Sequence, residues 1–159
     1  MESNNNNTIY IQSTAQENGF LNTFFKIENG FRIDGLSYNS SEHFFQSKKF
    51  EFSDPAYFDT VRTSPSSNKA HQLGNARNGG ILRPDWDAVK FDVMYQGNFE
   101  KFSQNEDLKK MLLDTGDKKI SQLSNSDKFW SVTPNGGKDL LGRILMKIRE
   151  TLKNEINIR

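Results

Sequence analysis

The 159-residue sequence contains no cysteine and only two histidines, His43 and His71. The lack of cysteine excludes disulfides, thiolate catalysis and zinc sites built on sulfur. Two histidines are too few for a histidine-rich metal site, and a Ser-His-Asp triad would have to recruit one of them. The signature motifs of P-loop, dinucleotide-binding, zincin and serine-hydrolase enzymes are also missing. Carboxylate catalysis without a metal or cofactor is the enzyme class that remains.

The chain also has no excess of charge and no long hydrophobic run. Its 21 Lys and Arg balance 20 Asp and Glu, which argues against a general polyanion-binding surface but leaves a local basic cluster open. No run of about 18 apolar residues is present, which excludes a membrane span. The first residues, MESNNNNTIYIQ, lack the basic and apolar regions of a secretory signal. We therefore expect a soluble cytoplasmic protein, and a nuclear location stays open.

Polar tracts and turn signals indicate how the chain is organised. Residues 1–7 include the run Asn4–Asn7, which cannot bury apolar surface and is expected to be disordered. Residues 8–159 contain no repeat and no linker, so we expect a single domain there. Strands are predicted at Thr8–Ile11 and at Phe31–Ile33, forming a hairpin or small sheet near the N-terminus.

Helical signals dominate the rest of the chain. Serines are expected to cap one helix at Ser40 or Ser41, and a second around Ser66–Asn75 that Gly74 closes. A third helix is expected to start at Pro84. A fourth helix is expected to end at Gly116. One of its faces consists of Leu108, Met111, Leu112 and Thr115.

The last helix has the clearest pattern. Lys147, Arg149 and Glu150 are expected to face away from its apolar stripe, which consists of Leu141, Ile144, Leu145, Ile148, Leu152 and Ile156. The predicted fold class is therefore α+β, a single helix-rich domain with a small N-terminal β-sheet.

Three segments carry candidate chemistry, and the first surrounds Glu42. In the first helical turn the macrodipole stabilises this carboxylate, so Glu42 is also an ordinary first-turn residue. Gln46 shares its face and Lys49 lies one turn further on. Such a stripe forms either a solvated face or the wall of a polar pocket. Taken alone, the pattern favours the solvated face.

The second segment is residues 75–86. Arg77, Arg83 and the pair Gly79-Gly80 precede a predicted helix start, an arrangement suited to phosphate but also common in flexible loops. Trp86 is either a core anchor or a stacking plate for a base, and composition alone favours the core.

The third segment is residues 126–142. Asp127 precedes Trp130, and a glycine-rich loop follows before the last helix. Glycines give a ligand room to approach the backbone. The alternative is a turn in which Asp127 acts only as a cap.

Six ordered blocks spread over about 130 residues resemble the YbiA-like family, also called NADAR, a far more specific signal than a lone motif. The blocks are Phe20-Leu-Asn-Thr-Phe24; Glu42-His-Phe-Phe-Gln-Ser-Lys-Lys-Phe50; Leu82-Arg-Pro-Asp-Trp86 with Lys90 and Met94; Lys101-Phe-Ser-Gln-Asn105 with Leu112-Leu-Asp-Thr-Gly-Asp117; Asp127-Lys-Phe-Trp130; and Gly137-Lys-Asp-Leu-Leu-Gly142 with Leu145-Met146 and Arg149.

The resemblance implies an N-glycosidase with a helix-rich fold and a small sheet. It implies a catalytic Glu42, a functional Trp86 and a catalytic Asp127. From the missing motifs we expect no metal and no cofactor. Family members act on phosphoribosylated pyrimidine intermediates of riboflavin synthesis or remove ADP-ribose from guanine in nucleic acid. The expected partner is therefore ADP-ribose or a ribosyl-phosphate substrate, including ADP-ribosylated DNA. The expected substrate-binding residues are Trp86, Trp130, Gln46, Lys48, Lys49, Arg77, Arg83, Asn22 and Asp139.

The sequence departs from the family pattern in three places. The W-G-x-G pattern reads Trp130-Ser-Val-Thr, the G-x-N pattern reads Gly137-Lys-Asp139, and the early S-N pair is replaced by Asn22-Thr23. Ser131 adds a side chain and Asp139 a negative charge where a ligand is expected. These changes bear on substrate identity more than on reaction type. They favour ADP-ribosyl chemistry, and they also leave a binding module with weak turnover open.

Overall fold

The computed structural model describes residues 7–76 and 79–158, so Arg77 and nearly all of the tract expected to be disordered lie outside the described residues. The chain forms two compact units. Met1–Asn22 and Glu106–Arg159 make up one, here called the terminal unit, and Thr23–Asn105 makes up the other, the central unit. The expectation of one domain over residues 8–159 stays a prediction.

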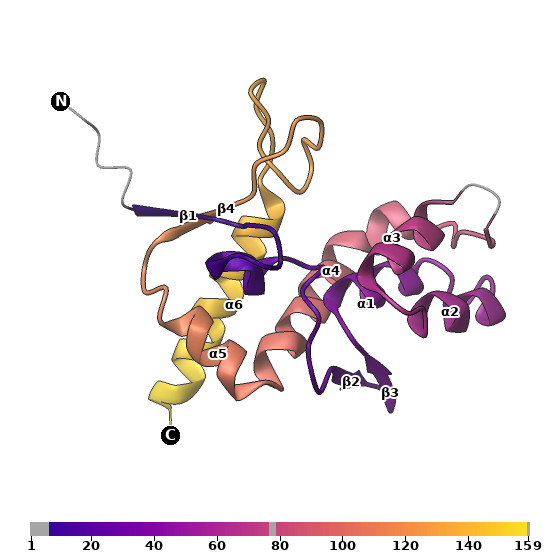
Figure 1. Ribbon diagram of the computed structural model, residues 1–159, viewed down its shortest axis with the longest axis horizontal. Helices are drawn as coiled ribbons and strands as arrows, with labels where there is room; N and C mark the ends of the chain where they lie inside the picture. The colour runs from indigo at the N-terminus through magenta and orange to yellow at the C-terminus, as the bar shows by residue number, and fades with distance from the viewer. Residues whose placement is uncertain (1–6, 77–78, 159) are drawn as a thin grey trace. The chain divides into compact units, whose positions relative to one another are not determined.

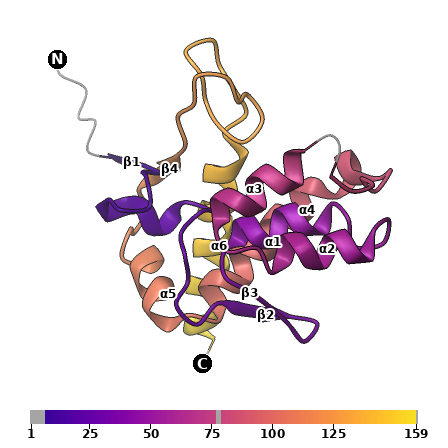
Figure 2. The same cartoon turned by 45° about the vertical axis from the view of Figure 1, so that its right-hand side comes forward.

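The central unit is built around α1 (Ser41–Lys48), every residue of which is buried. Three helices pack against it: α2 (Pro55–Arg62), α3 (Ser67–Asn75) and α4 (Trp86–Ser103) (Figures 1 and 2). Ser40 caps α1 and Ser66 caps α3, each by accepting a backbone N–H three residues on. Both predicted caps are therefore present.

A hairpin of β2 (Phe31–Ile33) and β3 (Leu36–Tyr38) precedes α1. Its turn residues Asp34 and Gly35 have φ values of 53° and 80°, the positive pair that a tight hairpin turn requires. Phe31 and Tyr38 stack across the two strands at 5.6 Å between ring centroids. This aromatic pair fastens the hairpin to the core of the unit, where both rings are buried.

The terminal unit joins the two ends of the chain. The strand β1 (Thr8–Tyr10) pairs in parallel with β4 (Lys119–Ser121), and a 3₁₀ helix, η2 (Glu17–Leu21), follows β1. The helices are α5 (Glu106–Leu113) and α6 (Leu140–Asn157), and α6 packs against both β4 and α5.

The α+β class is confirmed, and several details differ from the predictions. The first strand pairs with β4, so it does not join the hairpin. The helix α2 was not predicted, although Asp54 caps it and Pro55 occupies its first turn. The helix α4 begins two residues after Pro84, and α3 continues through Gly74 to Asn75.

The faces of α5 and α6 also differ from prediction at three positions. Met111 and Ile156 are exposed at 41% and 49%, so neither belongs to the buried face. Arg149 was expected to face away from the core, yet it is buried and donates to Thr115 Oγ1 and the Lys118 carbonyl. A guanidinium can be buried in this way because the turn after α5 supplies acceptors for it.

Candidate active site

Glu42 is a buried carboxylate held by three side chains of the central unit. Its exposure is only 4%. Oε2 accepts a hydrogen bond from Thr23 Oγ1 at 2.9 Å, and Oε1 accepts from Gln46 Nε2 and from His71 Nδ1, both at 2.8 Å. Burying a carboxylate is costly unless it is hydrogen-bonded, and three donors meet that requirement here.

The polar stripe of α1 is therefore not a solvated face. Gln46 and Lys49 are 3% and 8% exposed, and both lie against α3. Helix α1 is enclosed by α2, α3 and α4, so even its polar side has a protein neighbour. The stripe of Glu42, Gln46 and Lys49 forms an interior polar wall.

Lys49 is the cationic member of this wall. Its Nζ donates to the Gly74 carbonyl and to Asn75 Oδ1, both at 3.2 Å. The same ammonium lies 5.8 Å from the ring centroids of Phe45 and Trp86. Burial lowers the pKa of Lys49 to about 8, while the charge of Glu42 acts in the opposite direction. The Lys49 ammonium therefore loses its proton at a lower pH than an exposed lysine does.

A cavity of about 330 Å³ opens beside Lys49. Its volume falls at the lower end of the range of ligand sites, ~300–1,000 Å³. Trp86 is 8% exposed and meets Phe45 edge-on at 5.0 Å, so it acts as a core anchor that also forms part of the cavity wall. The lining residues are Lys49, Phe50, Gly74, Asn75, Ala76, Gly80, Leu82 and Trp86.

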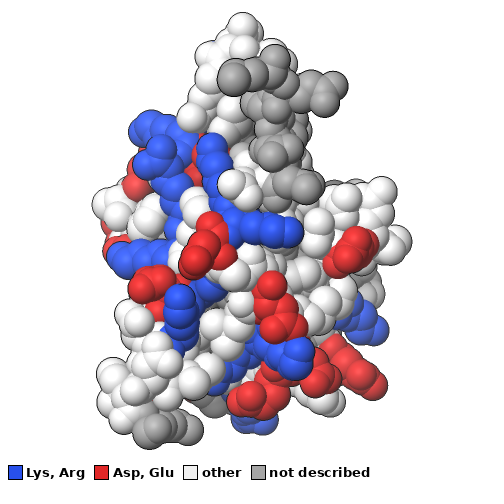
Figure 3. All heavy atoms as spheres, turned by 90° about the vertical axis from the view of Figure 1, so that its left-hand side faces the viewer, with Lys and Arg blue, Asp and Glu red and all other residues white. Residues whose placement is uncertain are grey.

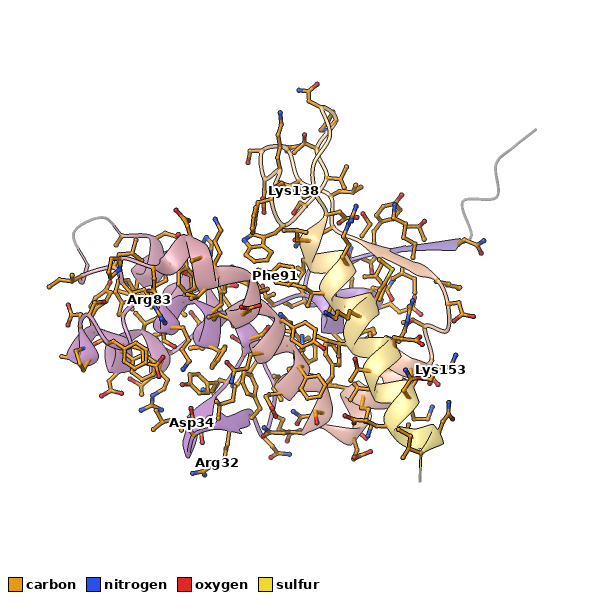
Figure 4. The ribbon with its side chains drawn as sticks, turned by 180° about the vertical axis from the view of Figure 1, so that it is seen from behind. Arg32, Asp34, Arg83, Phe91, Lys138 and Lys153 are labelled. Carbon is orange, nitrogen blue, oxygen red and sulfur yellow. The ribbon has the colours of Figure 1, made fainter. Side chains whose placement is uncertain are left out.

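Asp127 belongs to the terminal unit and organises a turn. Its Oδ1 accepts from the backbone N–H groups of Phe129 and Trp130 at 2.9 and 3.0 Å. The rings of those two residues meet at 4.6 Å, nearly perpendicular to each other. Lys138, in the loop before α6 (Figure 4), places its Nζ 5.4 Å from the Phe129 centroid. The cap role considered for Asp127 is thus realised, and a catalytic role stays a prediction.

Comparisons with known proteins agree with the sequence resemblance. The family model described as the NADAR domain matches residues 9–153. The chain belongs to the NADAR family.

Individual NADAR relatives cover most of the chain. An N-glycosidase of Nostoc punctiforme is 31% identical over 95% of this chain and 96% of its own length. The NMR structure of the Escherichia coli protein YbiA matches with a TM-score of 0.84 and 32% identity, over 96% of this chain and 88% of that one. The predicted enzyme class, a hydrolase acting on N-glycosyl bonds, is confirmed at the level of the family.

A third relative is larger. A riboflavin biosynthesis protein of Vibrio vulnificus is 34% identical over 91% of this chain but over only 38% of its own length. The region that resembles NADAR therefore makes up a minor part of that protein.

The structure shows the contacts of Asp139 and Ser131, two residues at which the chain departs from the NADAR pattern. Asp139 has a left-handed φ of 53° and is 6% exposed. Its Oδ2 accepts from Ser121 Oγ at 2.7 Å and its Oδ1 from the Gln122 N–H at 3.0 Å. Both oxygens are thus directed at β4 and the residue after it, so the geometry gives no support to Asp139 as a ligand contact. Ser131 is buried, with its Oγ 3.0 Å from Gln122 Oε1 and 3.4 Å from Asp127 Oδ2.

Most other candidate binding residues already have partners. Lys48 pairs with Glu51 at 2.7 Å. Arg83 (Figure 4) forms two hydrogen bonds with Asp85, and this pairing raises its pKa. In the terminal unit, the side chain of Asn22 donates to the Gln12 carbonyl. These contacts favour local structural roles over phosphate binding.

The sequence reasoning missed His71. Its Nδ1 contacts Glu42, and that hydrogen bond raises its pKa. His43 is different: it is buried, Ser40 and Ser64 hold its ring, and burial lowers its pKa. One feature of the sequence could have identified His71. The chain has only two histidines, and His71 lies on the helix predicted around Ser66–Asn75.

Surface charge, helix hydrophobicity and clusters of metal-binding side chains bear on the expected partners. On the face shown in Figure 3, basic side chains are interspersed with acidic ones. Among residues 7–76 and 79–158, no helix is both long and apolar enough to cross a membrane. Within the same ranges, no three or more His, Asp or Glu side chains gather as a metal site would require, so we assign none.

Proposed function

We propose that this NADAR protein hydrolyses the ribose C1–N bond of an ADP-ribosylated nucleobase, with guanine in DNA as the base. The observation that carries the proposal is Glu42, a buried carboxylate with three hydrogen-bond donors. One of these donors, Gln46, packs against Gly74, which lines the cavity beside Lys49. A carboxylate is expensive to bury, and a charge that its neighbours hold in place is suited to stabilising opposite charge that develops in a transition state.

The chemistry explains why a fixed carboxylate suits this reaction. Cleavage of a ribose C1–N bond passes through an oxocarbenium-like state in which positive charge develops on the sugar. In our proposal the Glu42 carboxylate stabilises that charge and aligns the attacking water. The electrons of the broken bond leave on the base nitrogen, which takes up a proton, and water supplies the hydroxyl at C1. Thr23, Gln46 and His71 keep the carboxylate from turning away during the step.

Lys49 and Trp86 are proposed to bind the substrate. The Lys49 ammonium at the cavity wall suits a phosphate oxygen, and the neighbouring indole and leucine surfaces suit a flat base or a ribose face.

Asp127 is proposed as the second carboxylate, which activates the water or helps the leaving base. This role rests on the family resemblance, and the roles of Asp127 and Glu42 are interchangeable in the proposal. The turn that Asp127 stabilises also orients Trp130, the other aromatic side chain proposed to stack on a base.

A second candidate substrate is a phosphoribosylated pyrimidine intermediate of riboflavin synthesis. The observation that favours it is the matching relative of Vibrio vulnificus, which is named as a riboflavin biosynthesis protein. The reaction and the role of Glu42 would be the same, with one phosphate in place of a diphosphate. A third candidate is an ADP-ribose-binding module with weak turnover, favoured by the presence of Ser131 where the family pattern has glycine.

The decisive experiment incubates the wild type and Glu42→Gln with a guanine-ADP-ribosylated DNA oligonucleotide and measures released ADP-ribose by mass spectrometry. Glu28→Gln is the matched control, because Glu28 is an exposed glutamate of the same unit. We expect release by the wild type and the control only.

Release by Glu42→Gln at the wild-type rate would overturn the role of Glu42. If the wild type releases nothing, the same three proteins are tested on phosphoribosylated pyrimidines. If it turns over neither substrate yet binds ADP-ribose, the binding module replaces the enzyme.

A further inference from the structure

The amide of Asn75 is oriented by Lys49. The Lys49 ammonium can only donate hydrogen bonds, so the atom it contacts at 3.2 Å is the Asn75 oxygen, Oδ1. The Asn75 Nδ2 group must then point the other way. It lies 2.9 Å from the His71 carbonyl and 3.3 Å from His71 Nε2. The Asn75 amide therefore presents a donor to the imidazole ring.

The other ring nitrogen of His71 faces an acceptor. His71 Nδ1 lies 2.8 Å from Oε1 of Glu42, and an ionised carboxylate can only accept. A neutral His71 thus carries its proton on Nδ1 and accepts at Nε2. Glu42 and Asn75 assign this tautomer from opposite sides of the ring. The Gln46 Nε2 group also lies near Nδ1, but at the longer distance of 3.5 Å, and it donates to Glu42 at 2.8 Å.

We propose that His71 is a positioning residue for Glu42, with Asn75 selecting its tautomer, so that Lys49, Asn75, His71 and Glu42 form one hydrogen-bonded chain. This inference rests on the proposed function for its kinetic consequence, but its geometry does not depend on any substrate. All four residues belong to the central unit, and two of them, Lys49 and Asn75, line the cavity.

The selected tautomer has a useful property. With the proton on Nδ1, His71 donates to Glu42 both as neutral imidazole and as imidazolium. Protonation occurs at Nε2, so it removes the acceptor that Asn75 uses and leaves the bond to Glu42 intact. Since the His71 side chain is 50% exposed, its Nε2 can exchange protons with solvent.

The surroundings of His71 explain the direction of its titration. Glu42, from α1, favours the imidazolium and raises the pKa through its hydrogen bond, whereas burial and Lys49, the residue that follows α1, lower it. The Phe24 ring, 5.2 Å away, covers part of the imidazole with an uncharged surface. The net effect is a raised pKa, because the hydrogen bond to Glu42 and the charge of Glu42 together outweigh burial and the charge of Lys49.

The tautomer can be measured without substrate by nitrogen-15 NMR of the two imidazole rings. We expect neutral His71 to carry its proton on Nδ1. His43 serves as the internal control with the opposite tautomer, because its Nε2 donates to the Ser64 carbonyl. Neutral His71 protonated on Nε2 in the wild type would overturn the proposal. This result stands whether or not any N-glycosidase substrate is turned over.

Two variants test the links on either side of the ring. Glu42→Gln removes the charge and should lower the titration midpoint of His71. Asn75→Asp replaces the donor facing Nε2 by an acceptor, and should raise that midpoint while leaving His43 unchanged. A His71 midpoint that responds to neither variant would overturn the hydrogen-bonded chain.

The positioning role is tested by the kinetics. His71→Leu removes the donor, and kcat should fall about 10- to 100-fold with little change in KM, since the substrate is not contacted. His71→Asn keeps an N–H near the position of Nδ1 and should recover most of the loss. Gln72→Ala, an exposed neighbour on α3, is the control. A change in KM alone, or equal loss in the Leu and Asn variants, would overturn the role.

Discussion

Gly74 on α3 lies so close to Gln46 on α1 that a Cβ on Gly74 would overlap the Oε1 atom of Gln46. This oxygen is buried and accepts no hydrogen bond from the described residues. Its amide partner, Nε2, donates to Glu42. The missing side chain at Gly74 thus leaves room for the amide that holds the Glu42 carboxylate.

We expect Gly74→Ala to displace Gln46 and break its bond to Glu42. Activity should fall about 10- to 100-fold through misplacement of the carboxylate. Stability should fall by roughly 1–3 kcal/mol from overpacking, measured by urea unfolding. Gly35→Ala is the control: no atom lies within 4 Å of its Cβ, but its φ of +80° is unfavourable for alanine. The control should lose stability alone, and a fully active, equally stable Gly74→Ala would contradict this account.

Lys49 should make substrate affinity depend on pH. Its pKa of about 8 means that the ammonium loses its proton as the pH rises from 7 to 9. If it binds phosphate, KM should rise about tenfold across this interval, because a charge-assisted hydrogen bond is worth about 1.5 kcal/mol or more. Lys49→Met should have a high KM throughout and lack this dependence. The exposed Lys69→Met is the control, and a pH profile shared by Lys49→Met and the wild type would rule out the role.

Lys101 on α4 should make stability rise with pH. Its side chain is fully buried, its Nζ lies 5.0 Å from the Phe102 centroid, and burial lowers its pKa to about 7. Between pH 7 and about 10 the folded chain has released this proton while the unfolded chain retains it, so the folded state gains stability as the pH rises. Below pH 7 the folded chain carries the Lys101 proton, and burial of this charge destabilises the folded state.

Urea unfolding of Lys101→Met at pH 6, 8 and 10 tests this. The variant should gain stability over the wild type at pH 6, and the gain should shrink by several kcal/mol at pH 10, since each pKa unit is worth about 1.4 kcal/mol. Lys69→Met, at an exposed position of the same unit, should not alter the slope. Parallel stability curves for Lys101→Met and the wild type would show that Lys101 has an ordinary pKa.

Two substitutions at Asp127 separate its turn from its proposed chemistry. Asp127→Asn keeps an oxygen that can accept from the Phe129 and Trp130 N–H groups but removes the charge. It should lose about 100-fold or more in kcat, within the range of general acid–base catalysis, with an unchanged melting temperature. Asp127→Ala should lose about 1–2 kcal/mol of stability as well. Full activity in Asp127→Asn would leave Asp127 as a structural cap.

Local physics explains what could be predicted from the sequence. Ser40 and Ser66 cap their helices as expected, because a cap depends on a side chain and an N–H group three residues away. The Asp34-Gly35 turn forms for the same reason, since its backbone angles depend on the two residues themselves. Ordered motif blocks likewise identified the family, because they are read directly along the chain.

Contacts between segments far apart in the sequence could not be predicted from local sequence signals. The pairing of β1 with β4 joins the two ends of the chain, and no local signal states which strand is the partner. Asp139 is a charged residue in a glycine-rich loop by sequence, yet β4 and the residue after it occupy both of its oxygens.

The sequence by itself determined every α-helix except α2, the serine caps of α1 and α3, the hairpin turn and the membership of a family of N-glycosidases. The tertiary structure alone decided that the stripe containing Glu42 is an interior wall, because only packing against α3 removes that side of α1 from water. It also decided that His71, 29 residues further along, shares a hydrogen bond with Glu42. Burial makes such a contact matter, since a carboxylate removed from water depends on the donors that the fold brings to it.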